Sequence, residues 1–274
     1  MTSSAVRQGT RAARAATASS GKPGLYQGHA DSQELGGDAA RPLLTLCPPS
    51  RLGSWDMSAR YAQMWSGGKD SALALDRASK QGIEIARLLT FYDRDTQRVR
   101  FHSTRVEMLE AQAAAIGIDL HAIPTSWPEM EASLRHELKS LREEGFSGVA
   151  FGDIHLADVR AWYEERVTAA GLNHIEPIWG ESPHLLLDEF ISSGGRAVIT
   201  CVELAKLDEA WLGRVIDDSF ASEIARTGVD PCGENGEYHS FAFAGPVFKQ
   251  PLSWAAGVRR LDSGFAQLDL TEGA

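Results

Sequence analysis

The sequence predicts an α/β fold, in which a parallel-sheet domain is followed by a smaller α+β C-terminal lobe. Apolar strand patterns alternate with helical patterns from Tyr61 to about residue 170, which implies right-handed crossovers and helices on both faces of a parallel sheet. A glycine-rich loop, Ser66–Ser71, separates the first strand from the first helix. After Gly171 the strands follow one another without long helices between them, which indicates a different second lobe.

The first half of the chain gives the clearest pattern of elements. The first strand is expected at 61–65 and the first helix at 71–80, which ends at Gly82. The further elements expected here are a strand at 85–92, a helix at 106–116, a strand at 120–124, a helix at 129–144, a strand at 148–154 and a helix at 156–170.

The second half is expected to complete the site that the first half opens. Its predicted elements are a helix at 181–193, a strand at 197–202, a short helix at 217–226 and strands at 238–243 and 258–270. We therefore expect a first domain over 57–160 and a second lobe over 161–254. Residues 255–274 fit either a hairpin or a tail.

Residues 1–56 differ in composition from the rest of the chain. Residues 1–30 are rich in Ala, Ser, Thr, Gly and Arg, contain no acidic residue and show no apolar period. Such a composition does not pack, so we expect a disordered extension or a misassigned start, with Met57 as the true first residue. Arg-rich, acid-poor N-termini also resemble organelle transit peptides, and this alternative stays open.

Composition narrows the class of protein. The 274 residues are 43% hydrophobic and 23% charged, which is typical of a globular protein, and no apolar run approaches the roughly 20 residues of a membrane helix. The net charge of −10 argues against a nucleic-acid partner, because phosphate backbones require clustered Lys and Arg. Three cysteines without a CxxC pair fit a reducing, cytoplasmic location.

The stretch Ser66-Gly67-Gly68-Lys69-Asp70-Ser71 predicts a phosphate site. Two adjacent glycines let backbone N–H groups approach a phosphate, and the following helix N-terminus adds unpaired donors. Lys69 contributes a positive charge. The loop lacks the four-residue spacer of the common P-loop, so it cannot wrap the β- and γ-phosphates in the same way. The alternative is a glycine turn that carries a surface lysine.

A second unusual stretch, Gly233–Phe241, contains two glutamates three residues apart. Glu234 and Glu237 each follow a glycine, which suits carboxylates presented from a tight loop for a metal, an amine or general-base chemistry. An ordinary turn into a strand, with Asn235-Gly236 supplying positive φ, explains the same residues. Composition alone does not decide between these interpretations.

Further motifs occur in order between about residues 62 and 254. They are Phe101-His102-Ser103, Gly152-Asp153-Ile154, Pro177-Ile178-Trp179-Gly180, Trp211-Leu212-Gly213-Arg214 with Asp217, and Pro246 with Phe248. With these motifs and with SGGKDS and GENGEYHSF, the chain resembles the diphthine–ammonia ligase family of PP-loop ATP pyrophosphatases. These are adenine nucleotide alpha hydrolase-like enzymes. The SGGKDS string alone is specific only to the superfamily, whereas its combination with GENGEYHSF is highly specific.

The resemblance implies a HUP/Rossmann-like nucleotide-binding domain and an ATP-dependent amide synthesis that uses Mg²⁺. In the family, a carboxylate is adenylated, pyrophosphate leaves, and ammonia then displaces AMP; the known substrate is diphthine, a modified histidine of elongation factor two. The implied catalytic residues are Lys69, Glu234 and Glu237, and the implied nucleotide contacts are Ser66, Gly67, Gly68, Lys69, Asp70 and Ser71. Asp70 is also the candidate magnesium ligand. The candidate substrate contacts are His102, Gly152, Asp153, Arg160, Asn235 and His239.

The forms Gly152–His155 and Pro231–Asn235 resemble bacterial members of the family, which leaves the identity of the carboxylate open. No N-terminal catalytic cysteine is present for a glutaminase, so free ammonium is the expected nitrogen donor.

Two other functions compete with the ammonia-ligase function. A sulfur-transfer tRNA-modifying enzyme also uses a PP-loop, but it needs reactive cysteines and a basic surface. A non-catalytic ATP sensor needs only the loop and has no use for Glu234 and Glu237.

Overall fold

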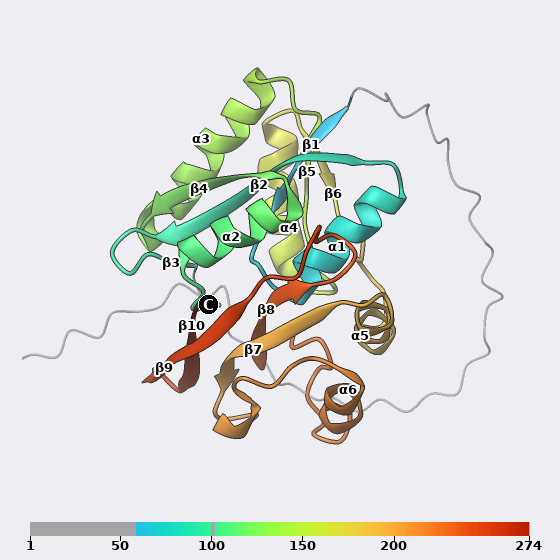
Figure 1. The fold of residues 1–274 in the computed structure, drawn as a ribbon. Coiled ribbons are helices and arrows are strands. Elements are labelled where there is room, and N and C mark those ends of the chain that lie inside the picture. Colours follow the sequence, from blue (N-terminus) through green and yellow to red (C-terminus); the bar gives the residue numbers. More distant parts are fainter. Residues whose placement is uncertain (1–58, 100–101, 274) are drawn as a thin grey trace, which may run out of the picture. The chain divides into compact units, whose positions relative to one another are not determined.

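The structure is a computed structural model, and it describes residues 59–99 and 102–273. The expectations for residues 1–56 lie outside this part of the chain. The described residues form two sheets, which we call sheet A and sheet B (Figure 1). Within this part of the chain, no helix is both long enough and apolar enough to cross a membrane.

Sheet A confirms the predicted parallel α/β fold. Its strands run in the order β3-β2-β1-β5-β6, and β4 also pairs with β2. The parallel strands are β1 (Arg60–Met64), β2 (Glu84–Asp93), β4 (Asp119–Thr125), β5 (Gly148–Ala150) and β6 (Asn173–Ile175). The short β3 (Arg98–Val99) is antiparallel to β2. The chain moves outward from β1 to β2 and β4 and then returns to β5 and β6, so the strand order reverses between β1 and β5.

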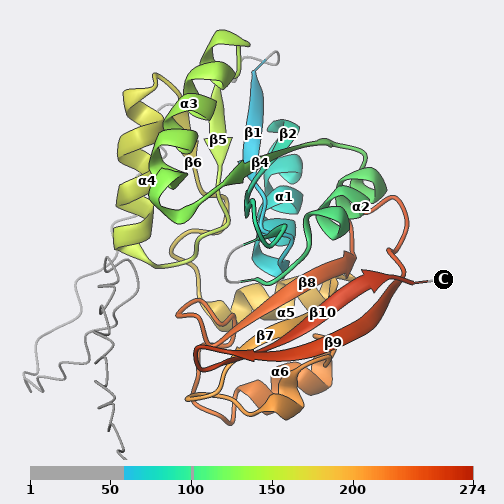
Figure 2. The same ribbon diagram turned by 90° about the vertical axis from the view of Figure 1, so that its left-hand side faces the viewer.

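Helices cover both faces of sheet A. They are α1 (Lys69–Lys80), α2 (Val106–Ile116), α3 (Met130–Glu143), which the 3₁₀ turn η1 (Trp127–Glu129) precedes, and α4 (Ala157–Ala169). Figure 2 shows α1 and α2 on one face and α3 and α4 on the other. Each pair of helices packs on the sheet through its own apolar cluster. The inward side chains recur at helical spacing, as in Leu134, Leu138 and Leu141 of α3, so each helix has one apolar face.

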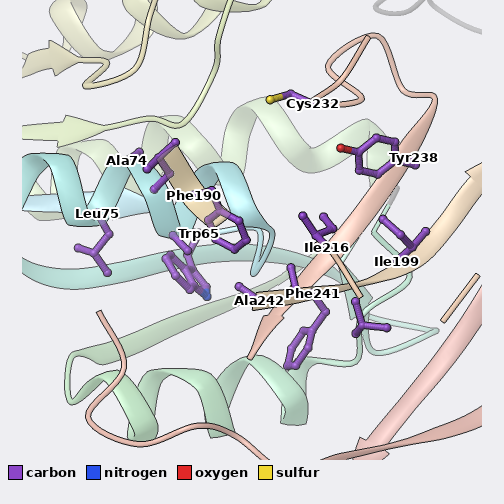
Figure 3. Packing of buried hydrophobic residues seen from close by; sticks show 14 of the residues in the cluster. Trp65, Ala74, Leu75, Phe190, Ile199, Ile216, Cys232, Tyr238, Phe241 and Ala242 are labelled. Carbon is purple, nitrogen blue, oxygen red and sulfur yellow. The ribbon is translucent and has the colours of Figure 1, made fainter. Parts of the chain in front are cut away.

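Sheet B is antiparallel, in the order β8-β7-β10-β9. Its strands are β7 (Arg196–Glu203), β8 (Tyr238–Ala244), β9 (Trp254–Asp262) and β10 (Phe265–Glu272). The helical segments in this half of the chain are α5 (Pro183–Ser192), η2 (Glu209–Trp211) and α6 (Asp218–Ile224). One apolar cluster joins the two sheets: it contains Trp65 and Leu75 as well as Phe241 of β8, and Trp65 lies beside Phe190 of α5 in Figure 3.

The structure differs from the expected elements at short strands. The two- and three-residue strands β3 and β6 are too short to show a period in the sequence. Because β6 pairs with β5, the change from sheet A to sheet B falls between Ile175 and Arg196, later than the expected boundary after residue 160. The strand expected at 258–270 is two strands that pair antiparallel around Ser263 and Gly264, both of which have positive φ.

Candidate active site

The Ser66–Ser71 loop follows β1 at the point where the strand order reverses, which is where open parallel sheets bind ligands. Helix α1 begins at Lys69, two residues earlier than expected, so Lys69 and Asp70 belong to its first turn. Gly67 has φ of +80°, and a Cβ there would lie 2.4 Å from Leu109 Cδ2. The loop therefore requires glycine at this position, both for its backbone conformation and for its packing.

Hydrogen bonds fix the shape of the loop from both sheets. Gln112 of α2 donates to the carbonyls of Gly67 (2.9 Å) and Ala242 (2.6 Å) and accepts from the indole of Trp65 (2.9 Å). The backbone N–H of Ala242 in β8 also donates to the Gly67 carbonyl at 2.8 Å. Sequence reasoning missed Gln112, although a glutamine three residues after Leu109 on an inward helix face was a usable signal.

The hydroxyls of the loop contact each other. The Oγ atoms of Ser66 and Ser71 lie 2.9 Å apart, and the N–H of Gly68 donates to Ser66 Oγ at 3.2 Å. The structure thus brings the six predicted loop residues together as one turn at the start of a helix, which is a position where proteins often bind anions.

Lys69 is buried rather than on the surface, with a relative exposure of 2%. Its ammonium group donates to Asp70 Oδ2 at 2.9 Å and to the Cys232 carbonyl, and it lies 5.0 Å from the centre of the Tyr238 ring. Burial disfavours the charge, but Asp70, Tyr238 and Cys232 outweigh it and raise the pKa of Lys69 above its usual value. Lys69 therefore stays protonated, and its ammonium group lies in a site with little access to water.

Further acidic groups lie near Asp70 at the ends of other elements. Gly152, just after β5, packs so closely that a Cβ would lie 3.1 Å from the backbone of Asp70. Burial and the nearby Asp70 raise the pKa of Asp153 to about 6. Burial also raises the pKa of Asp70 itself, although Lys69 opposes this. Because like charges repel, each of these carboxylates raises the pKa of the neighbouring carboxyl groups.

Glu234, which belongs to the loop before β8, lies near Asp70 and Asp153. Its Oε1 accepts hydrogen bonds from the backbone N–H groups of Ile154 (2.8 Å) and His155 (3.4 Å). Burial, followed by the charge of Asp70, raises the pKa of Glu234 to about 8. A carboxylate that holds its proton near neutral pH is suited to accepting and releasing protons.

Glu237 makes a different set of contacts. It is buried, and its Oε1 accepts from Asn235 Nδ2 (3.3 Å) and the Asp230 N–H (3.4 Å) within its own loop and lies 4.0 Å from Lys206 Nζ. Its Oε2 has no hydrogen-bond partner in the part of the chain that the structure describes. Glu234 and Glu237 therefore point to different neighbours, although the motif places them three residues apart.

His102 and His239 meet above the loop, with ring centres 4.5 Å apart. The imidazole carbon Cε1 of His102 would lie 3.4 Å from a Cβ at Gly68. Burial lowers the pKa of His102 to about 4 and lowers the pKa of His239 well below its usual value. Both rings are therefore neutral near pH 7 and can donate a hydrogen bond without adding charge.

Arg160 lies at the end of β6 rather than at the loop. Its Nε is 3.2 Å from Glu176 Oε2, and its guanidinium stacks 4.6 Å from the centre of the Trp179 ring. Glu176 was not predicted; its position directly after a strand is the signal that sequence reasoning could have used, but β6 itself was not recognised.

The two described cysteines are buried. Cys232 Sγ lies 3.2 Å from the Pro183 carbonyl, and burial raises the pKa of Cys201 to about 12. These thiols are not suited to sulfur transfer, because the thiolate is the reactive form.

Comparison with known proteins identifies the family. The model of the diphthamide synthase N-terminal domain matches residues 59–174, and that of the C-terminal domain matches residues 182–269. A diphthine–ammonia ligase of Danio rerio is 32% identical over 219 residues, which cover 70% of this chain and 85% of that protein. The chain belongs to the diphthamide synthase family.

Diphthine–ammonia ligases of Rattus norvegicus and Homo sapiens are 26% and 27% identical, and each alignment covers 70% of this chain and 82% of the relative. A solved U34-tRNA thiolase, NcsA from Methanococcus maripaludis with its [4Fe–4S] cluster, covers 48% of this chain and 56% of its own at 17% identity, with a TM-score of 0.31 that is too low to establish a shared fold. As a member of the diphthamide synthase family, the chain is an ATP-dependent ligase of the PP-loop type. The two family domains coincide with sheet A and sheet B.

Proposed function

We propose that the chain joins ammonia to a carboxylate in two steps at the carboxyl ends of β1 and β5. In the first step a carboxylate oxygen attacks the α-phosphorus of ATP and pyrophosphate leaves. In the second step the nitrogen of ammonia attacks the acyl carbon, the bond to the AMP oxygen breaks, and a proton passes to the protein. The supporting observation is that a donor-rich loop with a buried cation lies beside Glu234, a carboxyl group with a pKa of about 8.

The loop residues would hold the phosphates. Backbone N–H groups of Gly67 and Gly68, the hydroxyls of Ser66 and Ser71 and the ammonium group of Lys69 supply donors and charge for the leaving pyrophosphate, a mainly electrostatic task. His102 and His239 lie against each other beside the loop as neutral rings, and in this proposal they donate hydrogen bonds to the α-phosphate or the acyl group.

Asp70 is the proposed magnesium ligand. Among the described residues, no group of three or more His, Cys, Asp or Glu is placed to hold a metal ion by itself. Mg²⁺ bound with ATP needs only one or two carboxylates, since phosphate oxygens and water complete its shell. Asp70 fits this demand, because its carboxylate is one-quarter exposed and already accepts one cation, Lys69. Bound magnesium would supply charge neutralisation on the phosphates.

Glu234 is the proposed base for the second step. Two backbone N–H groups hold its Oε1, so the carboxylate is positioned before ammonia arrives. Glu237 is a second candidate through its unpartnered Oε2, and Asn235 holds its other oxygen. Gly152, which packs against the backbone of Asp70, and Asp153 are the proposed substrate contacts, and Arg160 would act further along the same edge of sheet A, beside Glu176.

The names of the relatives suggest diphthine as the first carboxylate to test. We propose free ammonium as the nitrogen donor and the cytoplasm as the location. Purified protein is incubated with ATP, Mg²⁺ and ammonium, with one carboxylate at a time, from diphthine-bearing elongation factor to small carboxylic acids. The proposal expects AMP and pyrophosphate that depend on one of these carboxylates. Formation of ADP instead would contradict it.

A further inference from the structure

A second group of buried polar atoms lies at the carboxyl end of β6. Glu176 directly follows this strand, and its side chain is 2% exposed; the side chain of His174, within the strand, is 3% exposed. In the part of the chain that the structure describes, neither carboxylate oxygen of Glu176 has a hydrogen-bond donor, and His174 Nε2 has no hydrogen-bond partner. Buried groups of this kind are rare in folded proteins and call for an explanation.

The three unpartnered atoms lie close together. His174 Nε2 is 3.5 Å from Glu176 Oε1. Burial lowers the pKa of His174, so its ring is neutral and one of its nitrogens is an acceptor. Arg160 Nε approaches Glu176 Oε2 to 3.2 Å but without hydrogen-bond geometry. The group therefore offers unpartnered acceptors, and the nearby donor group of Arg160 forms no hydrogen bond with them.

The surroundings carry an excess of negative charge. Asp153 acts on Glu176 from the neighbouring strand end, and burial together with Asp153 raises the pKa of Glu176 to about 7. Glu164 lies 3.6 Å from Arg160, which therefore divides its charge between two carboxylates. The faces of Trp179 and Phe151 lie against Arg160 and His174, at 4.6 Å in both cases. Aromatic faces also attract cations.

These features describe a site for a small cation that has several N–H donors. We propose that Glu176 and His174 form an ammonium subsite at the carboxyl end of β6, near Asp153. The proposal rests on the amide-forming function above and adds to it the place where the nitrogen substrate is first held. Phosphates and carboxylates are excluded because the charge here has their own sign. Ammonium can donate to both Glu176 oxygens and to His174 at once, which would satisfy all three buried atoms.

Rubidium is a test probe that does not depend on activity. Rubidium ions have a size close to that of ammonium and scatter X-rays anomalously, so crystals of the full chain are soaked in rubidium chloride. We expect an anomalous peak beside the Glu176 carboxylate that disappears when ammonium chloride is added in excess. No peak at this place, or a peak that ammonium does not displace, would overturn the proposal without the need for any variant.

Variants extend the test to ammonium itself. The melting temperature is followed against ammonium chloride, with sodium chloride as the ionic-strength reference. Glu176→Gln should raise the half-saturating ammonium concentration about tenfold or more, since a charge-assisted contact is lost. The matched control Glu164→Gln removes an exposed carboxylate with the same arginine partner and should leave this concentration within about twofold. Equal curves for wild type and Glu176→Gln would contradict the subsite.

Failure of this subsite can be told apart from failure of the proposed function. AMP formation from ATP is measured on the same preparations with the carboxylate panel. If AMP forms but rubidium does not bind at Glu176, the ligase function stands and the subsite is wrong. If rubidium binds but AMP never forms with any carboxylate, the cation site stands and its assignment to amide synthesis is wrong.

Discussion

Lys69 and Asp70 place opposite charges side by side in the first turn of α1. The lysine is almost fully buried, and the hydrogen bond between the two side chains is 2.9 Å long. Because the Cys232 carbonyl also accepts from Lys69, the ammonium group is held before any ligand binds. A charge fixed in a dry site stabilises developing negative charge without reorganisation.

Lys69→Met should therefore impair the adenylation step more than the fold. The methionine keeps much of the side-chain volume but removes the charge, and we expect AMP formation to fall by about 100-fold or more. The measurement is AMP release by chromatography at saturating ATP. Lys80→Met is the matched control, because Lys80 lies on the same helix, is exposed and forms an ion pair with Asp76 one turn away. Equal losses in both variants would contradict the assignment.

Glu234→Gln should separate the two steps. Glutamine keeps an oxygen for the Ile154 and His155 N–H groups, so ATP binding should persist, while ammonia-dependent product formation should fall by about 100-fold. We expect Glu237→Gln to abolish amidation as well while sparing ATP binding. ATP affinity by calorimetry and amide formation by mass spectrometry check both variants, and unchanged turnover in either would remove that residue from the account.

The role of Glu234 as a base predicts that the rate of amide formation depends on pH. A base must be deprotonated to act, and the pKa of Glu234 is raised to about 8. The rate of amide formation at fixed free ammonia should therefore rise with pH up to about 8 and then level off. The residual rate of Glu234→Gln should lack this rise. A wild-type profile that is flat between pH 6 and about 9 would show that another group is the base.

At the scale of elements, Asp269 of β10 joins sheet B to sheet A. Its buried carboxylate accepts hydrogen bonds from Arg98 of β3 at 2.7 and 2.9 Å and from Arg105, which precedes α2, at 2.7 to 3.1 Å. Arg98 also donates to the Ser103 carbonyl, so this cluster holds the segment that carries His102. Buried carboxylates with two arginine partners are costly to disrupt one partner at a time.

Asp269→Asn should lower the free energy of unfolding by about 3 kcal/mol, because two arginines lose a partially buried counter-charge. Burial raises the pKa of Asp269, but hydrogen bonds from Arg105 and Arg98 outweigh it and hold the pKa below its usual value. This stabilisation is therefore complete above the unfolded-state pKa of about 4 and is lost as the pH falls below it. Urea unfolding at pH 7 and at acid pH checks both statements.

Glu272→Gln, an exposed position on the same strand, is the control for that experiment and should change stability by less than about 0.5 kcal/mol. The difference between wild type and Asp269→Asn should shrink in acid. A difference that stays constant down to low pH would show that the charge of Asp269 does not contribute.

At the scale of the whole molecule, one apolar cluster connects the loop after β1 to both sheets. The alternation of elements and the position of the loop were predictable, because both follow from local pattern and from the geometry of parallel sheets. Gln112 and Glu176 were not predicted. Their roles depend on partners far along the chain, and β6 is too short to show a period.

The GENGEYHSF stretch shows the same limit. The sequence predicted that both glutamates are presented from one tight loop and left their roles open, whereas the turn directs Glu234 toward the end of β5 and Glu237 into its own loop. The direction of a side chain in a turn depends on φ and ψ at Gly233 and Gly236, both positive here, and residue spacing does not specify it.

Adenylation of the carboxylate substrate can be followed through the fate of its oxygen atoms. The protein is incubated with ATP, Mg²⁺, ammonium and a carboxylate substrate labelled with oxygen-18, and AMP is examined by mass spectrometry. Attack of the carboxylate on the α-phosphorus transfers a labelled oxygen to AMP when the amide forms. We expect labelled AMP together with unlabelled pyrophosphate. Unlabelled AMP, or label in inorganic phosphate beside ADP, would contradict it.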